Sequence, residues 1–172
     1  LAVATLTCLA ASAVQVRAQQ GATAWPNQTI RIVVGFGAGG GNDILARLLA
    51  DKMSKSLGQP VIVENKPGGG GGVGGSFVKS QPADGYTLLV GASGAMAVGP
   101  AVGVPASYDS VTDFEPVSLL ATFPLVVLVN AESPHKTLAE LIAWSKGNAP
   151  SAYYASSSPS LTLATEMIKL ES

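Results

Sequence analysis

The chain has 172 residues, of which 47% are hydrophobic and 12% are charged, and its formal net charge is -1. This length is enough to bury a sizeable core, and the composition excludes an intrinsically disordered chain. Because no run of Lys or Arg forms a basic patch, we expect no binding to nucleic acid.

Residues 1–24 are typical of a secretory signal peptide. The apolar run LAVATLTCLAASAV is too short to span a bilayer, and small-residue patterns suited to signal peptidase end at Ala18 and Ala24. Since no basic segment or initiating Met precedes the run, we expect the sequence to be clipped at its amino end. Cleavage after Ala18 removes Cys8, the one cysteine of the chain. We therefore expect an exported, periplasmic protein with no disulfide, no cofactor and no metal site, since His135 is the one histidine.

From residue 25 onward, strand and helix signals alternate, which predicts an α/β fold with a parallel sheet and crossover helices. A β-branched run predicts the first strand over 30–34. Apolar residues at helical spacing predict a helix from Asp43 to Leu57, with Asn42 as its cap and Gly58 as its stop. A second strand is predicted over 61–63, a shorter helix up to residue 79, and a third strand over 86–90.

In the second half of the chain, the sequence predicts a connection to a second lobe. Residues 117–120 and 125–129 are predicted to be extended, and Thr137 with Glu140 forms a capping box for a helix to about residue 146. A strand over 153–156 and a helix from 161 to 170 follow. We expect a first lobe over 25–122 and the start of a second lobe over 123–172, cut within its last helix.

The turn Gly35 to Gly40 fits the dinucleotide-binding pattern G-x-G-x-x-G between a strand and a helix. Glu64 ends the next strand, where an acidic residue would bind the ribose. It lies 24 positions after Gly40, however, which is further than the usual spacing of about 20, and an exported protein meets little nicotinamide cofactor. A dinucleotide-dependent oxidoreductase remains an alternative function.

The same turn can bind a smaller anion, because the backbone N–H groups at a helix start are unpaired and lie at the positive end of the helix dipole. The turns Ser93 to Ala95 and Ser156 to Ser160 also follow predicted strands. Such turns share one edge of a parallel sheet, so three donor-rich turns around one cleft predict a carboxylate site. The glycine cluster 67–75 either contributes to this cleft or is a flexible connection.

One motif is similar to that of a hydrolase. Residues 91–95 differ by one residue from the nucleophile motif G-x-S-x-G around Ser93, and Asp113 and His135 follow in the order of an α/β-hydrolase triad. The last glycine of the motif is replaced by Ala95, and His135 lies in a polar loop before a helix. We interpret His135 as an exposed loop residue and expect that the protein is not an enzyme.

Six blocks, in this order, carry a family resemblance: Trp25-Pro26, IRIVVGFGAGGGNDILARLLADKM, GQPVIVENKPGGGGGVGG, ADGYTLLVGASGAMAVGPA, YDSVTDFEPVSLLA and YASSSPSLTLATE. Through their order and spacing, the chain resembles the extracytoplasmic receptors of tripartite tricarboxylate transporters, the Bug receptors. The resemblance implies a type II periplasmic-binding-protein-like fold, in which two Rossmann-like lobes enclose a ligand cleft and the second lobe is truncated here.

The resemblance also implies a function. A monomeric receptor would capture a di- or tricarboxylate or a related organic acid and deliver it to the integral-membrane subunits of a tripartite transporter. A receptor that senses its ligand without transport is a further alternative.

Carried over position by position, the implied ligand-binding residues come from three turns: Phe36, Gly39, Gly40 and Asp43; Ser93 and Gly94; and Tyr154, Ala155 and Ser156. The chain departs from the family in side chains that could donate hydrogen bonds or shape the turns. Family members often have prolines at the positions of Gly35 and Gly37, Asn at the position of Gly99, and His at the position of Thr162.

Overall fold

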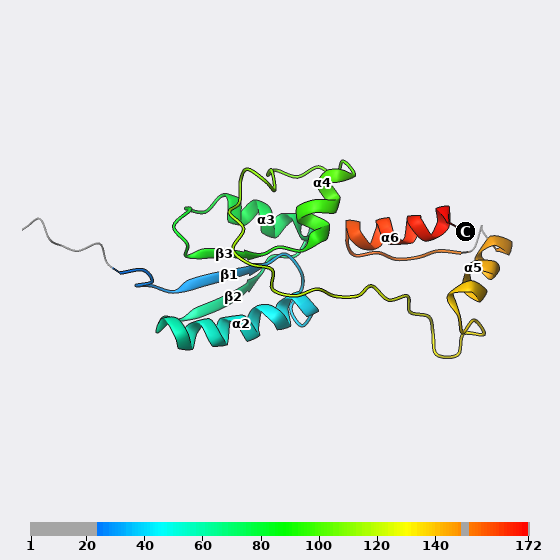
Figure 1. Cartoon of the computed structure of the whole chain (residues 1–172), viewed down its shortest axis with the longest axis horizontal. Coiled ribbons are helices and arrows are strands. Elements are labelled where there is room, and N and C mark those ends of the chain that lie inside the picture. The colour runs from blue at the N-terminus through cyan, green and yellow to red at the C-terminus, as the bar shows by residue number, and fades with distance from the viewer. Residues whose placement is uncertain (1–23, 149–151, 172) are drawn as a thin grey trace, which may run out of the picture.

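The computed structural model describes residues 24–148 and 152–171. The predicted signal peptide, residues 1–24, lies outside these ranges except for Ala24, and Cys8 therefore also lies outside them. The described chain is elongated: a part that contains a sheet is joined by an extended stretch to two helices (Figure 1).

The sheet has three parallel strands, β1 (Ile30–Val34), β2 (Val61–Asn65) and β3 (Thr87–Val90), in the order β2-β1-β3. Ile30 is in register with Val61 on one side, and Arg31 is in register with Thr87 on the other. The first strand has the predicted bounds, and β2 is two residues longer than predicted. Strand β1 is the central strand, and its apolar side chains Ile30, Ile32, Val33 and Val34 are buried.

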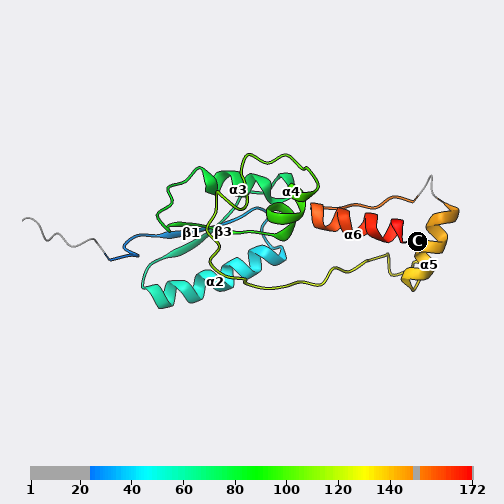
Figure 2. The same cartoon turned by 45° about the horizontal axis from the view of Figure 1, so that its top comes forward.

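Helices α2 (Gly41–Leu57) and α3 (Gly72–Lys79) cover opposite faces of the sheet (Figures 1 and 2). The face towards α2 carries the core, which consists of Ile32, Val34, Ala46, Ala50 and Val90. Side chains alternate along a strand, so Val33, fully buried, points to the other face. The predicted α/β arrangement with a parallel sheet is confirmed for this part of the chain.

The ends of α2 differ in how well they were predicted. Gly58 ends the helix in the left-handed conformation, with φ of 67°, and its N–H donates to the Ser54 carbonyl, as expected of a glycine stop. The helix starts at Gly41, however, and its N-cap is Gly40 rather than Asn42. The predicted cap is therefore wrong.

Three short helical turns follow the strands at their carboxyl ends: η2 (Gly69–Gly71) after β2, and η3 (Gly94–Val98) with α4 (Gly99–Ala101) after β3. The turn that leads from β1 into α2 lies at the same end of the sheet, because all three strands are parallel. One edge of the sheet therefore carries the first turn, the glycine cluster and the second turn.

The remaining helices are α5 (Leu138–Gly147) and α6 (Pro159–Leu170). The predicted capping box of α5 is confirmed: the Glu140 N–H donates to Thr137 Oγ1 at 3.2 Å, and the Thr137 N–H donates to Glu140 Oε2 at 3.2 Å. The start of α6 packs against η3, so the second half of the chain returns to the edge of the sheet (Figure 2).

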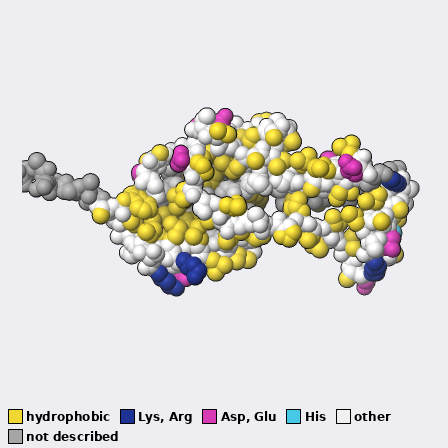
Figure 3. Space-filling view, in the orientation of Figure 1, with side chains coloured by type: hydrophobic (Ala, Val, Ile, Leu, Met, Phe, Trp, Pro, Cys, Tyr) yellow, Lys and Arg dark blue, Asp and Glu magenta, His cyan; other side chains and the backbone are white. Residues whose placement is uncertain are grey.

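Three predicted extended segments, residues 117–120, 125–129 and 153–156, belong to no sheet within the described residues. The strand predicted over 153–156 is therefore wrong. A strand needs the N–H and C=O groups of a neighbouring strand, and these segments meet no such ladder in the described chain. Their apolar side chains stay exposed, with Val117 at 87% and Leu128 at 85%. Figure 3 shows hydrophobic side chains at the surface of this linking stretch.

Candidate functional site

Asp43 organises the first turn. Its carboxylate, 2% exposed, accepts hydrogen bonds from the Gly39 N–H at 2.8 Å, from Arg47 Nε at 2.9 Å and from Asn65 Nδ2 at 2.9 Å. Donation by Arg47, reinforced by the Gly39 N–H and Asn65, holds the pKa of this carboxyl well below its usual range. Asp43 therefore fixes the turn as an anion.

The Gly39 N–H is occupied by this bond, so other amides of the turn are the available donors. The first intrahelical bond of α2 runs from the Ile44 N–H to the Gly40 carbonyl at 3.0 Å. The N–H groups of Gly41 and Asn42 precede it and have no partner within the helix. They lie at the positive end of a helix of 17 residues, where a carboxylate is stabilised.

The glycine cluster packs directly beneath the first turn. A Cβ on Gly35 would lie 2.6 Å from the Gly71 carbonyl oxygen, and a Cβ on Gly74 would lie 2.8 Å from the Gly35 Cα. The Phe36 ring lies against Gly71, where a Cβ would be 3.1 Å from the ring. The cluster is therefore a packed part of this edge, which decides the question left open by its sequence.

The second turn meets the Ser-rich turn of the second half. Ser93 Oγ lies 3.3 Å from Ser160 Oγ, and a Cβ on Gly94 would lie 3.3 Å from the Ser158 Cβ and 3.4 Å from the Pro159 Cδ. Gly94 is buried, so any larger residue would push the start of α6 away from η3. The predicted proximity of these two turns is present in the structure.

Hydroxyl groups hold the Ser-rich turn together. Thr162 Oγ1 donates to Ser156 Oγ at 2.9 Å, and Ser156 Oγ donates to the Ser158 carbonyl at 2.9 Å. Tyr154 OH donates to Glu166 Oε1 at 2.6 Å, and this bond raises the pKa of Tyr154. Ala155, like Tyr154 and Ser156, is exposed.

A cleft of ≈ 550 Å³ opens between the two halves of the chain. One wall is formed by Gly69, Gly70 and the loop that follows α4, and the other by residues of the Ser-rich turn and α6. Of the nine predicted ligand-binding residues, Ser156 lines this cleft directly. Gly94 lies behind its wall, in contact with Ser158 and Pro159.

The sequence missed the residues of the cleft from η2 and α6, namely Gly69, Gly70, Thr162, Leu163 and Glu166. For the two glycines a signal existed, because the cluster follows β2 and so had to lie at the same sheet edge as the other turns. For the residues of α6 there was no local signal, since they line the cleft only because α6 packs against η3, which is distant in the sequence.

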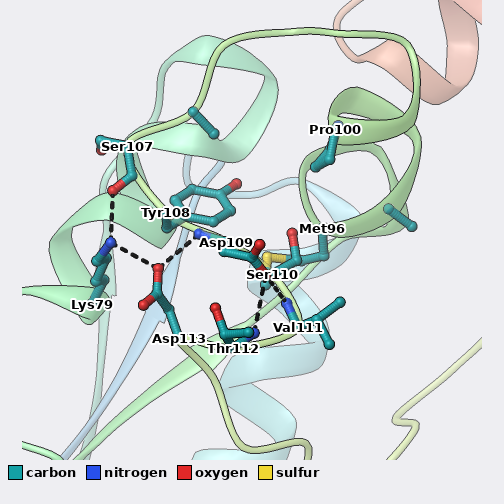
Figure 4. A pocket seen from close by; sticks show the side chains of 12 residues that line it. Lys79, Met96, Pro100, Ser107, Tyr108, Asp109, Ser110, Val111, Thr112 and Asp113 are labelled. Atoms are coloured by element: carbon teal, nitrogen blue, oxygen red, sulfur yellow. Dashed lines mark hydrogen bonds and ion pairs between the residues drawn. The ribbon is translucent and has the colours of Figure 1, made fainter.

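A larger cleft of ≈ 870 Å³ lies beside the loop 106–113 (Figure 4). Its charged groups are bonded within the loop and to α3: Lys79 Nζ lies 2.7 Å from Asp113 Oδ2, and Asp109 Oδ1 accepts from the Val111 and Thr112 N–H groups. Among the described residues, Ser110 Oγ is buried without a partner. None of the nine predicted residues lines this cleft, and its bonds stabilise the loop.

The three residues of the candidate hydrolase triad each contact a partner outside the triad. Ser93 Oγ is bonded to Ser160, Asp113 is paired with Lys79, and the His135 ring packs on the Trp144 ring at 5.4 Å. A triad needs the nucleophile bonded to the histidine and the histidine to the carboxylate. His135 is half-buried against Trp144, so its interpretation as an exposed loop residue is corrected.

Glu64, the candidate ribose-binding residue, is likewise paired with side chains of this chain. Glu64 Oε1 lies 2.6 Å from Lys66 Nζ, and Glu64 Oε2 lies 3.4 Å from Arg31 Nε. The bond to Lys66 lowers the pKa of Glu64, and both oxygens are engaged in ion pairs on the sheet.

Residues 24–148 and 152–171 contain no cluster of His, Cys, Asp and Glu that could hold a metal ion. In the same ranges, no helix combines the length and the apolar character that crossing a membrane requires.

Comparison with known proteins agrees with this geometry. Residues 45–172 match the family described as "Tripartite tricarboxylate transporter family receptor". The chain is 41% identical over 134 residues to a UPF0065 protein of Bordetella bronchiseptica, covering 78% of this chain and 40% of that protein. It is 40% identical over 126 residues to the protein BugT of Bordetella pertussis, covering 73% of this chain and 39% of BugT.

Solved structures show the same fold. MatC from Rhodopseudomonas palustris, solved with bound malate, is 35% identical with a TM-score of 0.68 over 72% of this chain and 42% of MatC. A second R. palustris protein, solved with adipate, is 36% identical with a TM-score of 0.67 over 72% of this chain and 41% of that chain. The α/β fold of a periplasmic solute-binding protein is therefore confirmed.

The chain spans 40% and 39% of the length of the two curated relatives named above, so it corresponds to less than half of such a receptor. Since the matched family covers residues 45–172, the chain belongs to the tripartite tricarboxylate transporter receptors, the Bug-type solute-binding proteins.

Proposed function

We propose that this protein is an extracytoplasmic receptor that binds a small organic acid and delivers it to the membrane subunits of a tripartite transporter. The observation that carries the proposal is the meeting of Ser93 and Gly94 with the turn of Ser158 and Ser160. The start of α2, whose first N–H groups have no partner within the helix, lies at the same edge of the parallel sheet. Such donors bind a carboxylate without Arg or Lys. The malate and adipate bound by the two R. palustris proteins support this ligand class.

In this proposal the ligand contacts Phe36, Gly40, Ser93, Gly94 and the Ser-rich turn with Tyr154, Ala155 and Ser156, while Asp43 and Gly39 hold the first turn in shape. Residues 25–122 form the first lobe, and residues 123–172 start the second. The receptor is periplasmic, exported by its signal peptide, and carries out no chemical reaction on its ligand. In support of this, the Ser93 hydroxyl, the candidate nucleophile, bonds the Ser160 hydroxyl rather than a general base.

A thermal-shift screen of the full-length protein against mono-, di- and tricarboxylates tests the proposal. A ligand at 100 times its dissociation constant stabilises the folded state by about 2.7 kcal/mol, which raises the Tm by about 5 to 10 °C for a domain of this size. The variant Gly94→Val tests the position of the site, because its side chain would push Ser158 and Pro159 away from η3 and should reduce the ligand-induced rise in Tm. If no carboxylate raises the Tm of the wild type, the proposal is wrong.

A further inference from the structure

The helical turn that follows β3 has a wider hydrogen-bond register than an α-helix. The Gly99 N–H donates to the Gly94 carbonyl, five residues back, where an α-helix would use the Ala95 carbonyl, four residues back. A Cβ on Gly99 would lie 2.8 Å from the Gly94 carbonyl oxygen, so this close approach requires a glycine. We call residues 94–99 the wide turn. Turns of this register are rare in proteins and occur frequently at functional sites.

The wide turn removes both helical donors from the Ala95 carbonyl. Its α-helical donor, the Gly99 N–H, is bonded to Gly94. Its donor in the wide register would be the N–H of residue 100, which is a proline and has none. The Tyr108 hydroxyl takes their place and donates to the Ala95 carbonyl at 3.0 Å in a buried bond. Because a buried carbonyl without a partner is costly, this bond favours the wide register over a return to the α-helical one.

Tyr108 is itself fixed by its surroundings on the loop 106–113 (Figure 4). Its side chain is buried, and a Cβ on Gly75 of α3 would lie 2.6 Å from the ring carbon Cε1. The Phe114 ring packs edge-on against the Tyr108 ring, with 5.4 Å between the centroids. Burial raises the pKa of Tyr108, so the phenol stays protonated and remains a donor at neutral pH. The position of the hydroxyl is therefore set by α3 and the loop.

The wide turn is also the surface that meets the start of α6. A Cβ on Gly94 would lie 3.4 Å from the Pro159 Cδ, and a Cβ on Gly99 would lie 3.5 Å from the Pro159 Cγ. The two glycines that the wide register joins therefore both contact the Pro159 ring. Ser93, directly before them, lies against Ser160. A return to the α-helical register would move Gly94 relative to Gly99 and change this contact.

We propose that Tyr108 is a positioning residue of the ligand site, whose hydroxyl holds the wide turn and so places Ser93 and Gly94 against the Ser-rich turn. The inference rests on the proposed function, in which Ser93 and Gly94 contact the ligand. The Tyr108 hydroxyl is bonded to Ala95, so it acts through the turn rather than on the ligand. Molecules with the turn in the other register would lower the apparent affinity in proportion to their fraction.

Isothermal titration of the full-length protein with acetate, malate, adipate and citrate tests the proposal, at a temperature where circular dichroism shows every variant folded. We expect Tyr108→Phe to bind at least about fivefold more weakly than the wild type, since one hydrogen bond holds the register. Tyr86→Phe is the matched control, because it removes a phenol hydroxyl that bonds Asn27 near the amino end of β3, away from the turns. Its affinity should stay within about twofold of the wild type.

The substitution Pro100→Ala adds a rescue that distinguishes positioning from a purely structural role. It gives residue 100 an N–H, which can donate to the Ala95 carbonyl in the wide register. Combined with Tyr108→Phe, it should return the affinity to within about twofold of that of Pro100→Ala alone. If Tyr108 served the stability of the fold alone, Tyr108→Phe would leave the affinity of the folded molecules unchanged.

The outcomes separate this inference from the proposed function. Equal affinities of Tyr108→Phe and the wild type would overturn the inference and leave the proposed function intact. A double variant that binds as weakly as Tyr108→Phe would also overturn it, because Tyr108 would then not act through the Ala95 carbonyl. If none of the four acids binds to the wild type, the proposed function and this inference fall together.

Discussion

The contact between Gly35 and Gly71 makes the substitution Gly35→Ala a sharp test of how the site edge is built. The Cβ of alanine would lie 2.6 Å from the Gly71 carbonyl oxygen and 2.8 Å from the Gly71 Cα. Ordinary van der Waals contact begins at 3.4 Å, so the glycine cluster would have to move by about 0.8 Å. Both partners are backbone atoms, so no side-chain rotation can relieve the clash.

Overpacking of this kind costs about 1 to 3 kcal/mol. For a domain of this size the expected loss in Tm is about 2 to 4 °C per kcal/mol, so Gly35→Ala should melt about 2 to 12 °C below the wild type. Thermal unfolding followed by circular dichroism measures this difference.

Gly37→Ala is the matched control, since a Cβ on Gly37 meets nothing within 4 Å. Gly37 also lacks a positive φ, so alanine there should leave the Tm unchanged or raise it slightly. Equal melting temperatures for the two alanine variants would refute the close packing of the first turn on the glycine cluster.

Three further substitutions probe the rest of the chain. Tyr108→Phe removes a buried hydroxyl that donates to the Ala95 carbonyl at 3.0 Å, so the free energy of unfolding should drop by about 1 to 3 kcal/mol in urea titration. Asp43 has a lowered pKa in the folded state, so the stability it contributes is present above about pH 4 and is lost as the pH falls further. Asp43→Asn should therefore be less stable than the wild type at neutral pH, and its Tm should decline less between about pH 5 and pH 3. Thr137→Ala removes the N-cap of α5 and should cost that helix about 1 kcal/mol, seen as faster amide hydrogen exchange in its first turn, and unchanged exchange would contradict the capping box.

Local patterns predicted most of the first half of the fold. The β-branched run of β1 and the glycine stop at Gly58 depend on neighbouring residues, so their bounds could be predicted. The N-cap of α2 was predicted at the wrong residue because Gly40 makes no side-chain capping bond, so its residue type does not identify it as a cap. Asp43, two residues into the helix, supplies the polar bond instead.

Long-range packing could not be predicted from local patterns. The approach of Gly71 to Gly35 depends on how α3 crosses the sheet, and spacing in the sequence does not encode that distance. The extended segments around Val117 and Leu128 have the composition of strands, but a strand forms where a partner supplies its hydrogen bonds. The position of Glu166 in the cleft could not be predicted for a similar reason, because it depends on the tertiary packing of α6 against η3.

In the proposed function, backbone donors at the three turns bind a carboxylate. Titration of the ¹⁵N-labelled full-length protein with an acid that raises its Tm, followed by amide chemical shifts, tests it most directly. We expect the largest shifts at Gly40, Gly41, Ser93, Gly94 and Ser156, whose amides border the proposed site. Shifts confined to the loop 106–113 around the larger cleft would contradict the claim.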